Sequence, residues 1–141
     1  MTIDRPGEVT DELLAALARL LPQLAPGRAP PTRRDVTEIV DGQTLLVARD
    51  DGGAIVGTLT LVRYRAPSGL RARIEDVIVD AAARGHGIGE ALTREAMRLA
   101  ADARVRTVEL TSAPARESAN RLYRRLGFEQ RATNVYVWRP L

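Results

Sequence analysis

The sequence contains no cysteine, no lysine, only one histidine (His86) and few aromatic residues. The absence of cysteine excludes disulfides, thiolate metal ligands and a cysteine nucleophile. A single histidine leaves no cluster of metal ligands. No apolar run approaches the roughly 18 residues of a membrane-spanning helix, and no signal-like segment opens the chain. We therefore expect a cytoplasmic protein that uses no metal and does not bind a membrane.

The charge of the chain is balanced, although every basic side chain except His86 is arginine. There are 21 basic and 18 acidic residues, which gives a net charge of +3. Proteins that bind nucleic acid gather basic residues on one face and add aromatic platforms. Here the arginines are spread along the chain, so we expect no nucleic-acid partner. The 141 residues, 45% of them hydrophobic, predict a single domain over residues 1–141.

The hydrophobic pattern predicts a mixed α/β fold. Apolar spacing, with Thr10 and Thr32 as N-caps, predicts helices over residues 8–24, 32–40, 87–103 and 114–126. Alternating or continuous apolar runs predict strands over residues 2–5, 44–49, 54–64, 70–80, 107–112, 128–131 and 135–138. Two early helices therefore precede a β-meander, which is followed by alternating helices and strands.

The most informative segment is a strand, residues 74–80, followed by a glycine-rich turn, Arg84-Gly85-His86-Gly87-Ile88-Gly89. Glycine has no Cβ, so a ligand can approach the backbone closely. The first amides of the following helix have no intrahelical partner and lie at the positive end of the helix dipole. This combination predicts a cradle for a pyrophosphate. The alternative interpretation is that the glycines serve only tight packing of strand and helix.

Two common phosphate-binding motifs do not describe this turn. The dinucleotide fingerprint places glycines at offsets 0, 2 and 5, whereas Gly85, Gly87 and Gly89 occupy alternate positions. A P-loop needs a lysine, and this chain has none. The ligand is therefore neither a dinucleotide bound in the Rossmann manner nor a nucleoside triphosphate in a P-loop.

Three segments together resemble the GNAT superfamily of acetyl-CoA-dependent N-acetyltransferases. The turn from Arg84 to Gly89 matches its pyrophosphate motif, R/Q-x-x-G-x-G/A. Residues 74–80 are similar to the central strand, whose backbone pairs with the pantetheine arm. Residues 120–128 resemble the second motif, in which Tyr123 lies four residues before Gly127-Phe128. The resemblance is good over residues 71–138 and weaker before them.

The resemblance implies the fold and the ligands. The expected GNAT fold has a central mixed, mostly antiparallel and splayed sheet flanked by helices. The cosubstrate would be acetyl-CoA, and the acceptor would be an amine of a small molecule, a peptide or a protein. Residues 24–40 would help to wall the acceptor pocket. The implied cofactor-binding residues are Val77, Ile78, Val79, Arg84, Gly85, His86, Gly87, Ile88, Gly89 and Asn120.

Tyr123 is the candidate general acid. A phenol with a pKa of about 10 is protonated at neutral pH and can give its proton to a departing thiolate. The alternative is that Tyr123 only packs against its neighbours. Asn120, one helical turn earlier, either hydrogen-bonds the cofactor or lies on the surface.

Glu75 is the preferred general base, with Asp76 as the second choice. Strand alternation places Glu75 on the face of Val77 and Val79, with Asp76 on the opposite face. The alternative role of Glu75 is to pair with Arg71 or Arg73, and a bulge in the strand would change this parity. His86 lies between two cradle glycines, where its backbone amide is useful and its imidazole is not expected to be catalytic.

The expected function is transfer of an acetyl group from acetyl-CoA to a primary amine. The alternative is a non-catalytic module that binds acyl-CoA and regulates a partner. The last predicted strand, residues 135–138, has bulky side chains on both faces. A second subunit could cover such a strand, so we also expect a homodimer.

Overall fold

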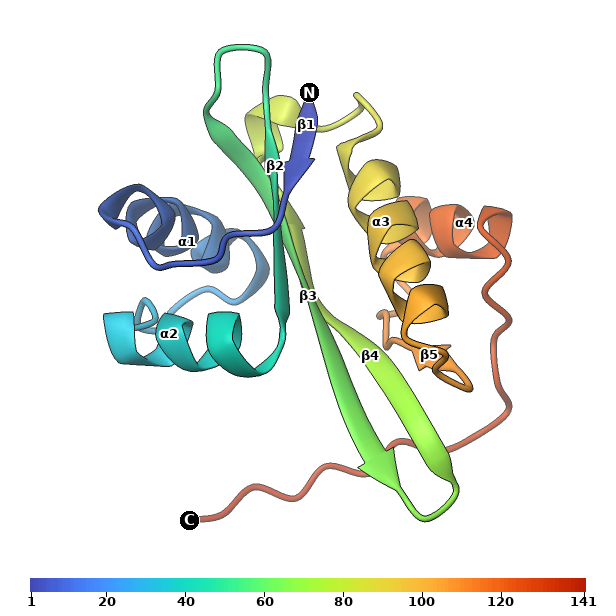
Figure 1. Ribbon diagram of the computed structural model, residues 1–141. Helices are drawn as coiled ribbons and strands as arrows, with labels where there is room; N and C mark the ends of the chain where they lie inside the picture. The colour runs from blue at the N-terminus through green and yellow to red at the C-terminus, as the bar shows by residue number, and fades with distance from the viewer. The chain divides into compact units, whose positions relative to one another are not determined.

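Five strands form one open sheet in the order β1-β2-β3-β4-β5. The first three pairings are antiparallel, and β4 pairs with β5 in parallel. The predicted mixed, mostly antiparallel sheet is therefore confirmed (Figure 1). The strands are β1 Thr2–Asp4, β2 Thr44–Arg49, β3 Ile55–Ala66, β4 Gly69–Val79 and β5 Val108–Glu109.

The computed structural model describes residues 1–141, which form two compact units, Met1–Leu110 and Thr111–Leu141. The first unit contains the whole sheet and the helices α1 Asp11–Leu24, α2 Arg33–Gly42 and α3 Ile88–Asp102, with a short 3-10 turn η1 at Ala81–Ala83. The second contains α4 Glu117–Arg125. None of the helices is both long and apolar enough to cross a bilayer.

The N-termini of α1 and α2 are capped as predicted. The Thr10 hydroxyl accepts a hydrogen bond from the Leu13 amide at 3.1 Å. Thr32 and Asp35 form a reciprocal capping box, with bonds of 2.9 and 3.1 Å. Such caps satisfy amides that have no intrahelical acceptor. The first residues of these two helices could therefore be predicted from the local sequence.

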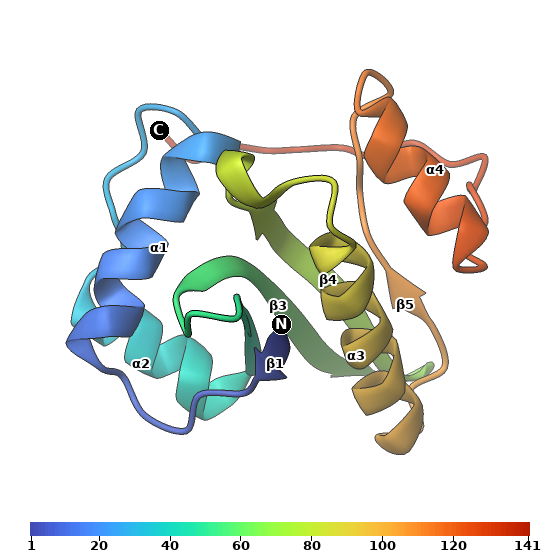
Figure 2. The same ribbon diagram turned by 90° about the horizontal axis from the view of Figure 1, so that it is seen from above.

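The sheet is covered on both faces, by α1 and α2 on one side and by α3 on the other (Figure 2). The core on the α1–α2 side is a cluster of Leu13, Ala16, Leu20, Val36, Leu45, Val47, Ile55 and Ile78. On the α3 side, a Cβ at Gly57 would come within 3.1 Å of Ile88 and 3.2 Å of Leu92. The absence of a side chain at Gly57 lets the start of α3 lie close against β3.

A β-bulge interrupts β4 at its centre. Thr60 lies opposite Glu75, but two residues further Thr58 lies opposite Ile78, so β4 contains one extra residue. Asp76 accommodates the bulge with a φ of 51°, in the left-handed region that most side chains avoid. The bulge reverses the alternation of faces along the rest of β4.

The C-terminal part of the chain differs from the prediction. Residues 128–141 form no helix or strand, so the predicted strands over residues 128–131 and 135–138 are wrong. Apolar alternation reports the preference of a segment for extended backbone but not whether a neighbouring strand is there to pair with it. The strand predicted over residues 107–112 is also shorter, and α4 begins at Glu117 instead of residue 114.

Candidate active site

The turn between β4 and α3 has the geometry of an anion cradle. Gly85 and Gly87 have φ angles of 84° and 77°, which non-glycine residues rarely adopt. Gly87 is the N-cap of α3, and no side chain caps the helix there. The amides of Ile88 and Gly89 belong to the first turn and have no intrahelical acceptor. A Cβ at Gly85 or Gly87 would meet no atom within 4 Å, so the space beside these two glycines is open.

The two charged or polar side chains of the turn fold back onto its backbone. Arg84 donates from Nε to the Val79 carbonyl oxygen at 3.1 Å. His86 Nδ1 lies 3.1 Å from the Ala83 carbonyl oxygen. The guanidinium of Arg84 therefore stays beside the cradle with its terminal nitrogens available to an anion. The imidazole of His86 helps to hold the turn.

The edge of β4 next to the cradle is largely unpaired within residues 1–110. β5 pairs with β4 only at Ala72 and Arg73. The Ala72 amide donates to the Thr107 oxygen, whereas the Asp80 amide donates to Val56 on β3. Main-chain groups alternate between the two edges of a strand. Those of Val77 and Val79 therefore point to the open edge.

Ile78 differs from its two neighbours. It lies opposite Thr58 in the β3–β4 register, and its side chain is buried in the core on the α1–α2 side. Its main-chain groups are directed toward β3. Of the three residues predicted to bind pantetheine, only Val77 and Val79 are placed to offer main-chain groups at the open edge.

Glu75 is held by an ion pair. Its Oε1 lies 3.0 Å from Arg73 Nε, and Arg73 Nη1 lies 3.9 Å from Glu109 Oε2. The predicted alternative pairing with Arg73 is therefore formed, although it engages one carboxylate oxygen and leaves Oε2 for another donor. The Glu75 side chain is 45% exposed.

The prediction that the side chain of Glu75 lies on the same face of β4 as those of Val77 and Val79 is wrong. Glu75 and Ile78 lie opposite Thr60 and Thr58, two residues apart on β3, so Glu75 shares its face with Ile78. Val79 lies opposite Gly57, on the α3 face. The cause is the bulge at Asp76, because an extra residue shifts the alternation by one.

Asp76 is the second carboxylate beside the bulge. Partial burial raises the pKa of its carboxyl group above the ordinary value, and the neighbouring Glu75 charge raises this pKa further. The Arg28 guanidinium, from the loop between α1 and α2, opposes this rise in pKa. Arg28 belongs to the segment, residues 24–40, that is predicted to wall the acceptor pocket. Neither Arg28 nor Glu109 was predicted from sequence, because no motif marks them.

Tyr123 and Asn120 lie on α4 in the second unit. Tyr123 is buried, with only 7% of its surface exposed. Its ring contacts Phe128 edge to face, with centroids 5.8 Å apart. Burial raises the pKa of the Tyr123 phenol, and Arg116 lowers it by a smaller amount. Asn120 Nδ2 donates to the Ala113 oxygen at 3.1 Å, so its amide group is used locally to shape the turn before α4.

A β-bulge lies beside a glycine-rich helix N-terminus on an open mixed sheet, which is the arrangement of an α/β protein with an anion cradle at the end of a central strand. The sequence matches the family described as Acetyltransferase (GNAT) family over residues 12–128, which includes parts of both units. The chain belongs to this acetyltransferase (GNAT) family.

Solved structures show the same fold. A proposed acetyltransferase from Agrobacterium tumefaciens str. C58 is similar with a TM-score of 0.82 and 24% identity, covering 99% of this chain and 100% of that one. A transcriptional regulator from Bacillus halodurans C-125 has a TM-score of 0.76 and 30% identity, with coverage of 97% and 98%. Ribosomal-protein-alanine N-acetyltransferase from Brucella melitensis biovar Abortus 2308 is similar with a TM-score of 0.77 and 22% identity, and the match covers 99% of each chain. A search of curated proteins found no significant match.

Proposed function

We propose that this protein transfers an acetyl group from acetyl-CoA to a primary amine. The observation that carries the proposal is the cradle, where an uncapped helix N-terminus, two glycines of positive φ and Arg84 surround open space. These groups fit a pyrophosphate because amides and a guanidinium both donate hydrogen bonds to anionic oxygens. Membership of the acetyltransferase (GNAT) family supports acetyl-CoA as the donor.

Acetyl-CoA supplies the activated acetyl group, and the residues of the chain bind and orient the reactants. Arg84 and the amides of the cradle would hold the pyrophosphate. The main-chain groups of Val77 and Val79 would hold the pantetheine arm and the acetyl oxygen. An amide placed where negative charge develops typically lowers a barrier by ~3 kcal/mol. Asn120 would contribute through Oδ1, because its Nδ2 already donates to the backbone.

Two side chains would move protons. Glu75 would accept the proton of the attacking amine at Oε2, while its other oxygen stays paired with Arg73. Tyr123 would give its proton to the departing thiolate. The raised pKa of Tyr123 keeps the phenol protonated over the whole neutral range.

The proposal is tested by titrating the protein calorimetrically with acetyl-CoA and by measuring thiol release with a panel of primary amines. The chain contains no lysine, so acetylation of its own side chains adds no background. Binding with amine-dependent thiol release supports an acetyltransferase. Tight binding without turnover on any amine supports the alternative, a regulatory module that binds acyl-CoA.

The two carboxylates at the bulge are expected to respond differently to neutralisation. Glu75→Gln should lower kcat by ~10²–10⁴-fold, because it removes the proton acceptor. Asp76→Asn should keep most activity and raise the melting temperature at neutral pH by about 2 °C. Asparagine tolerates the left-handed backbone and removes a carboxylate whose ionisation is disfavoured by burial and by Glu75.

The pH dependence of this stabilisation has a definite sign. The raised pKa means that folding favours the protonated form of Asp76. The wild-type protein therefore loses folding stability through Asp76 only at pH values at which this carboxyl group is ionised. The advantage of Asp76→Asn should therefore disappear as pH falls below the ordinary aspartate pKa of about 3.9. Thermal melts at several pH values measure it. A larger loss of kcat in Asp76→Asn than in Glu75→Gln would transfer the role of base to Asp76.

We further propose a homodimer that covers the C-terminal segment Val135–Trp138. These four side chains are 69%, 88%, 64% and 83% exposed, and bulky apolar groups in water favour burial against a partner. Light scattering at micromolar concentration is expected to give twice the mass of one chain, and Trp138→Glu should shift the mass toward that of a monomer. A monomer mass for the wild type would refute this proposal.

A further inference from the structure

One face of the β3–β4 hairpin continues from Glu75 toward the hairpin tip. Directly opposite residues share a face, and the pairs here are Thr60 with Glu75, Val62 with Arg73 and Tyr64 with Arg71. We call Val62, Tyr64, Arg71 and Arg73 the hairpin face. It lies on the same side of the sheet as α1 and α2, because Thr60 also lies opposite the core residue Leu45. The hairpin projects past α2 (Figure 1), so neither α1 nor α2 covers its tip.

The two arginines of the hairpin face are in different electrostatic situations. Arg73 is neutralised by Glu75 at 3.0 Å and by Glu109 at 3.9 Å. Arg71 makes no ion pair with any carboxylate of the chain. Its guanidinium lies over the ring of Tyr64, 5.4 Å from the centroid. Of these two arginines, only Arg71 therefore has a positive charge available to a ligand.

The hydrogen bonding of Arg71 is also incomplete. Its Nε is buried and has no hydrogen-bond acceptor. Buried donors in folded proteins are almost always bonded, so such an atom indicates a missing acceptor. A guanidinium that packs over an aromatic ring is restricted in its motion, and its planar set of donors matches the oxygens of a carboxylate or a phosphate.

Charges of opposite sign thus lie at two positions along one strand. The carboxylates Glu75 and Asp76 are at the centre of β4, and Arg71 is four residues from Glu75 toward the hairpin tip, roughly 14 Å along β4 at about 3.4 Å per residue. We propose that the amine acceptor carries an anionic group, a carboxylate or a phosphate, which Arg71 binds while the amine reaches Glu75. Val62 and Tyr64 would contact the apolar part of the acceptor between its two charged ends. This inference rests on the proposed acetyl transfer.

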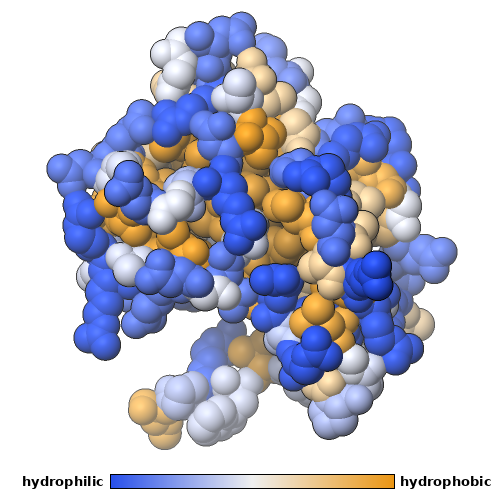
Figure 3. Space-filling view, viewed as in Figure 1, coloured by the Kyte–Doolittle hydropathy of each residue, from blue (hydrophilic) through white to orange (hydrophobic).

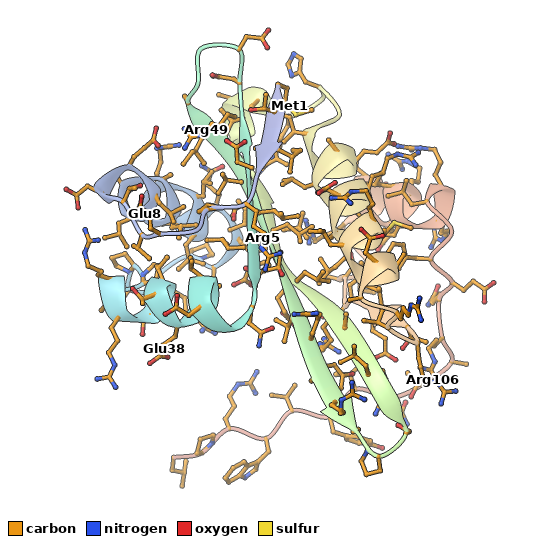
Figure 4. All side chains as sticks on the ribbon, in the orientation of Figure 1. Met1, Arg5, Glu8, Glu38, Arg49 and Arg106 are labelled. Carbon is orange, nitrogen blue, oxygen red and sulfur yellow. The ribbon has the colours of Figure 1, made fainter.

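The opposite face of the same hairpin provides a matched control. Arg65 lies opposite Leu70, one register position from the Tyr64–Arg71 pair, and is exposed. Its charge is the same, but it points to the other side of the sheet. Arg106, which is labelled in Figure 4, stabilises the hairpin tip by donating from Nη1 to the Ser68 oxygen at 2.7 Å, and it should stay unchanged in both variants.

The experiment compares three matched sets of acceptors: ω-amino carboxylates of increasing chain length, their primary amides, and the corresponding ω-amino alkyl phosphates. In wild type, kcat/KM should be about 10-fold to 100-fold higher for an anionic acceptor than for its amide, mostly through KM. The set with the higher value identifies carboxylate or phosphate. Arg71→Gln should abolish the preference, whereas Arg65→Gln should keep it. The KM for acetyl-CoA should be the same in all three proteins.

Two results would overturn the inference. One is equal kcat/KM for anionic and amide acceptors in wild type, and the other is an undiminished preference in folded Arg71→Gln. Calorimetric titration of the ω-amino carboxylates and phosphates in the presence of CoA separates this test from that of the proposed function. If no amine is acetylated, binding that Arg71→Gln removes still supports the anion site. Absence of binding to wild type overturns it.

Discussion

Gly87→Glu is expected to lower the affinity for acetyl-CoA by at least about 100-fold. Gly87 caps α3 with a φ of 77°, and a Cβ there would enter the open space of the cradle. A glutamate would place a negative charge where the pyrophosphate is expected to bind. Two like charges about 4 Å apart near a protein surface repel by ~4 kcal/mol, enough for a loss of this size. Calorimetric titration measures the affinity directly.

The matched control for this variant is Gly53→Glu. Gly53 also has a positive φ, 87°, and open space around its Cβ, but it lies in the β2–β3 turn. It therefore carries the same backbone strain and the same charge change without approaching the cradle. Arg84→Ala should lower the affinity for acetyl-CoA by only about 10-fold, because the backbone amides of the cradle still bind the pyrophosphate. Unchanged affinity in a folded Gly87→Glu protein would mean that the cradle does not bind the cofactor.

Tyr123→Phe is expected to lower kcat by ~10²–10⁴-fold, the usual contribution of a general acid. The substitution removes the phenol proton but keeps the ring, so the edge-to-face contact with Phe128 should persist. Affinity for acetyl-CoA and the melting temperature should change little. Steady-state kinetics at saturating acetyl-CoA, with single-turnover rates to isolate chemistry, test the expectation.

Two further measurements make the Tyr123 test specific. An acyl donor with a more acidic thiol needs less proton transfer and should partly restore the rate of Tyr123→Phe. Tyr136→Phe removes a hydroxyl from an exposed tyrosine of the C-terminal segment and should keep the wild-type kcat. Because burial raises the pKa of Tyr123, loss of its proton should reduce the rate only above about pH 10. A wild-type kcat in Tyr123→Phe, with chemistry rate-limiting, would assign Tyr123 to packing alone.

The surface agrees with a composition rich in charge. The face seen in Figure 3 is mostly hydrophilic, with smaller apolar areas between charged side chains. Several charged side chains of the protein form exposed or partly exposed ion pairs, such as Arg49 with Asp4 and Glu12 or Arg98 with Glu95 and Asp102. Exposed pairs of this kind contribute little to stability. Against this background, Arg71 is distinguished by a buried Nε that has no hydrogen-bond acceptor, which indicates a ligand more clearly than the net charge does.

The sequence by itself determined the features that depend on local backbone chemistry. Thr10 and Thr32 cap helices within their own first turns, and the glycines of the cradle allow a backbone that other residues avoid. The helices and the order of the first five strands followed from hydrophobic periodicity. The cradle proposed for the pyrophosphate could be located for the same reason, because a strand, a glycine-rich turn and a helix start are contiguous in the chain.

The tertiary structure alone decided the features that depend on pairing between distant segments. The bulge at Asp76 becomes visible only in the register with β3, and it moves Glu75 to the face opposite Val79. The ion pair of Arg73 with Glu109 requires the parallel alignment of β4 with β5. The predicted strand at residues 135–138 has apolar alternation but no pairing strand. Strand partners and cross-strand charges arise from contacts across the fold, which a one-dimensional pattern of side chains does not encode.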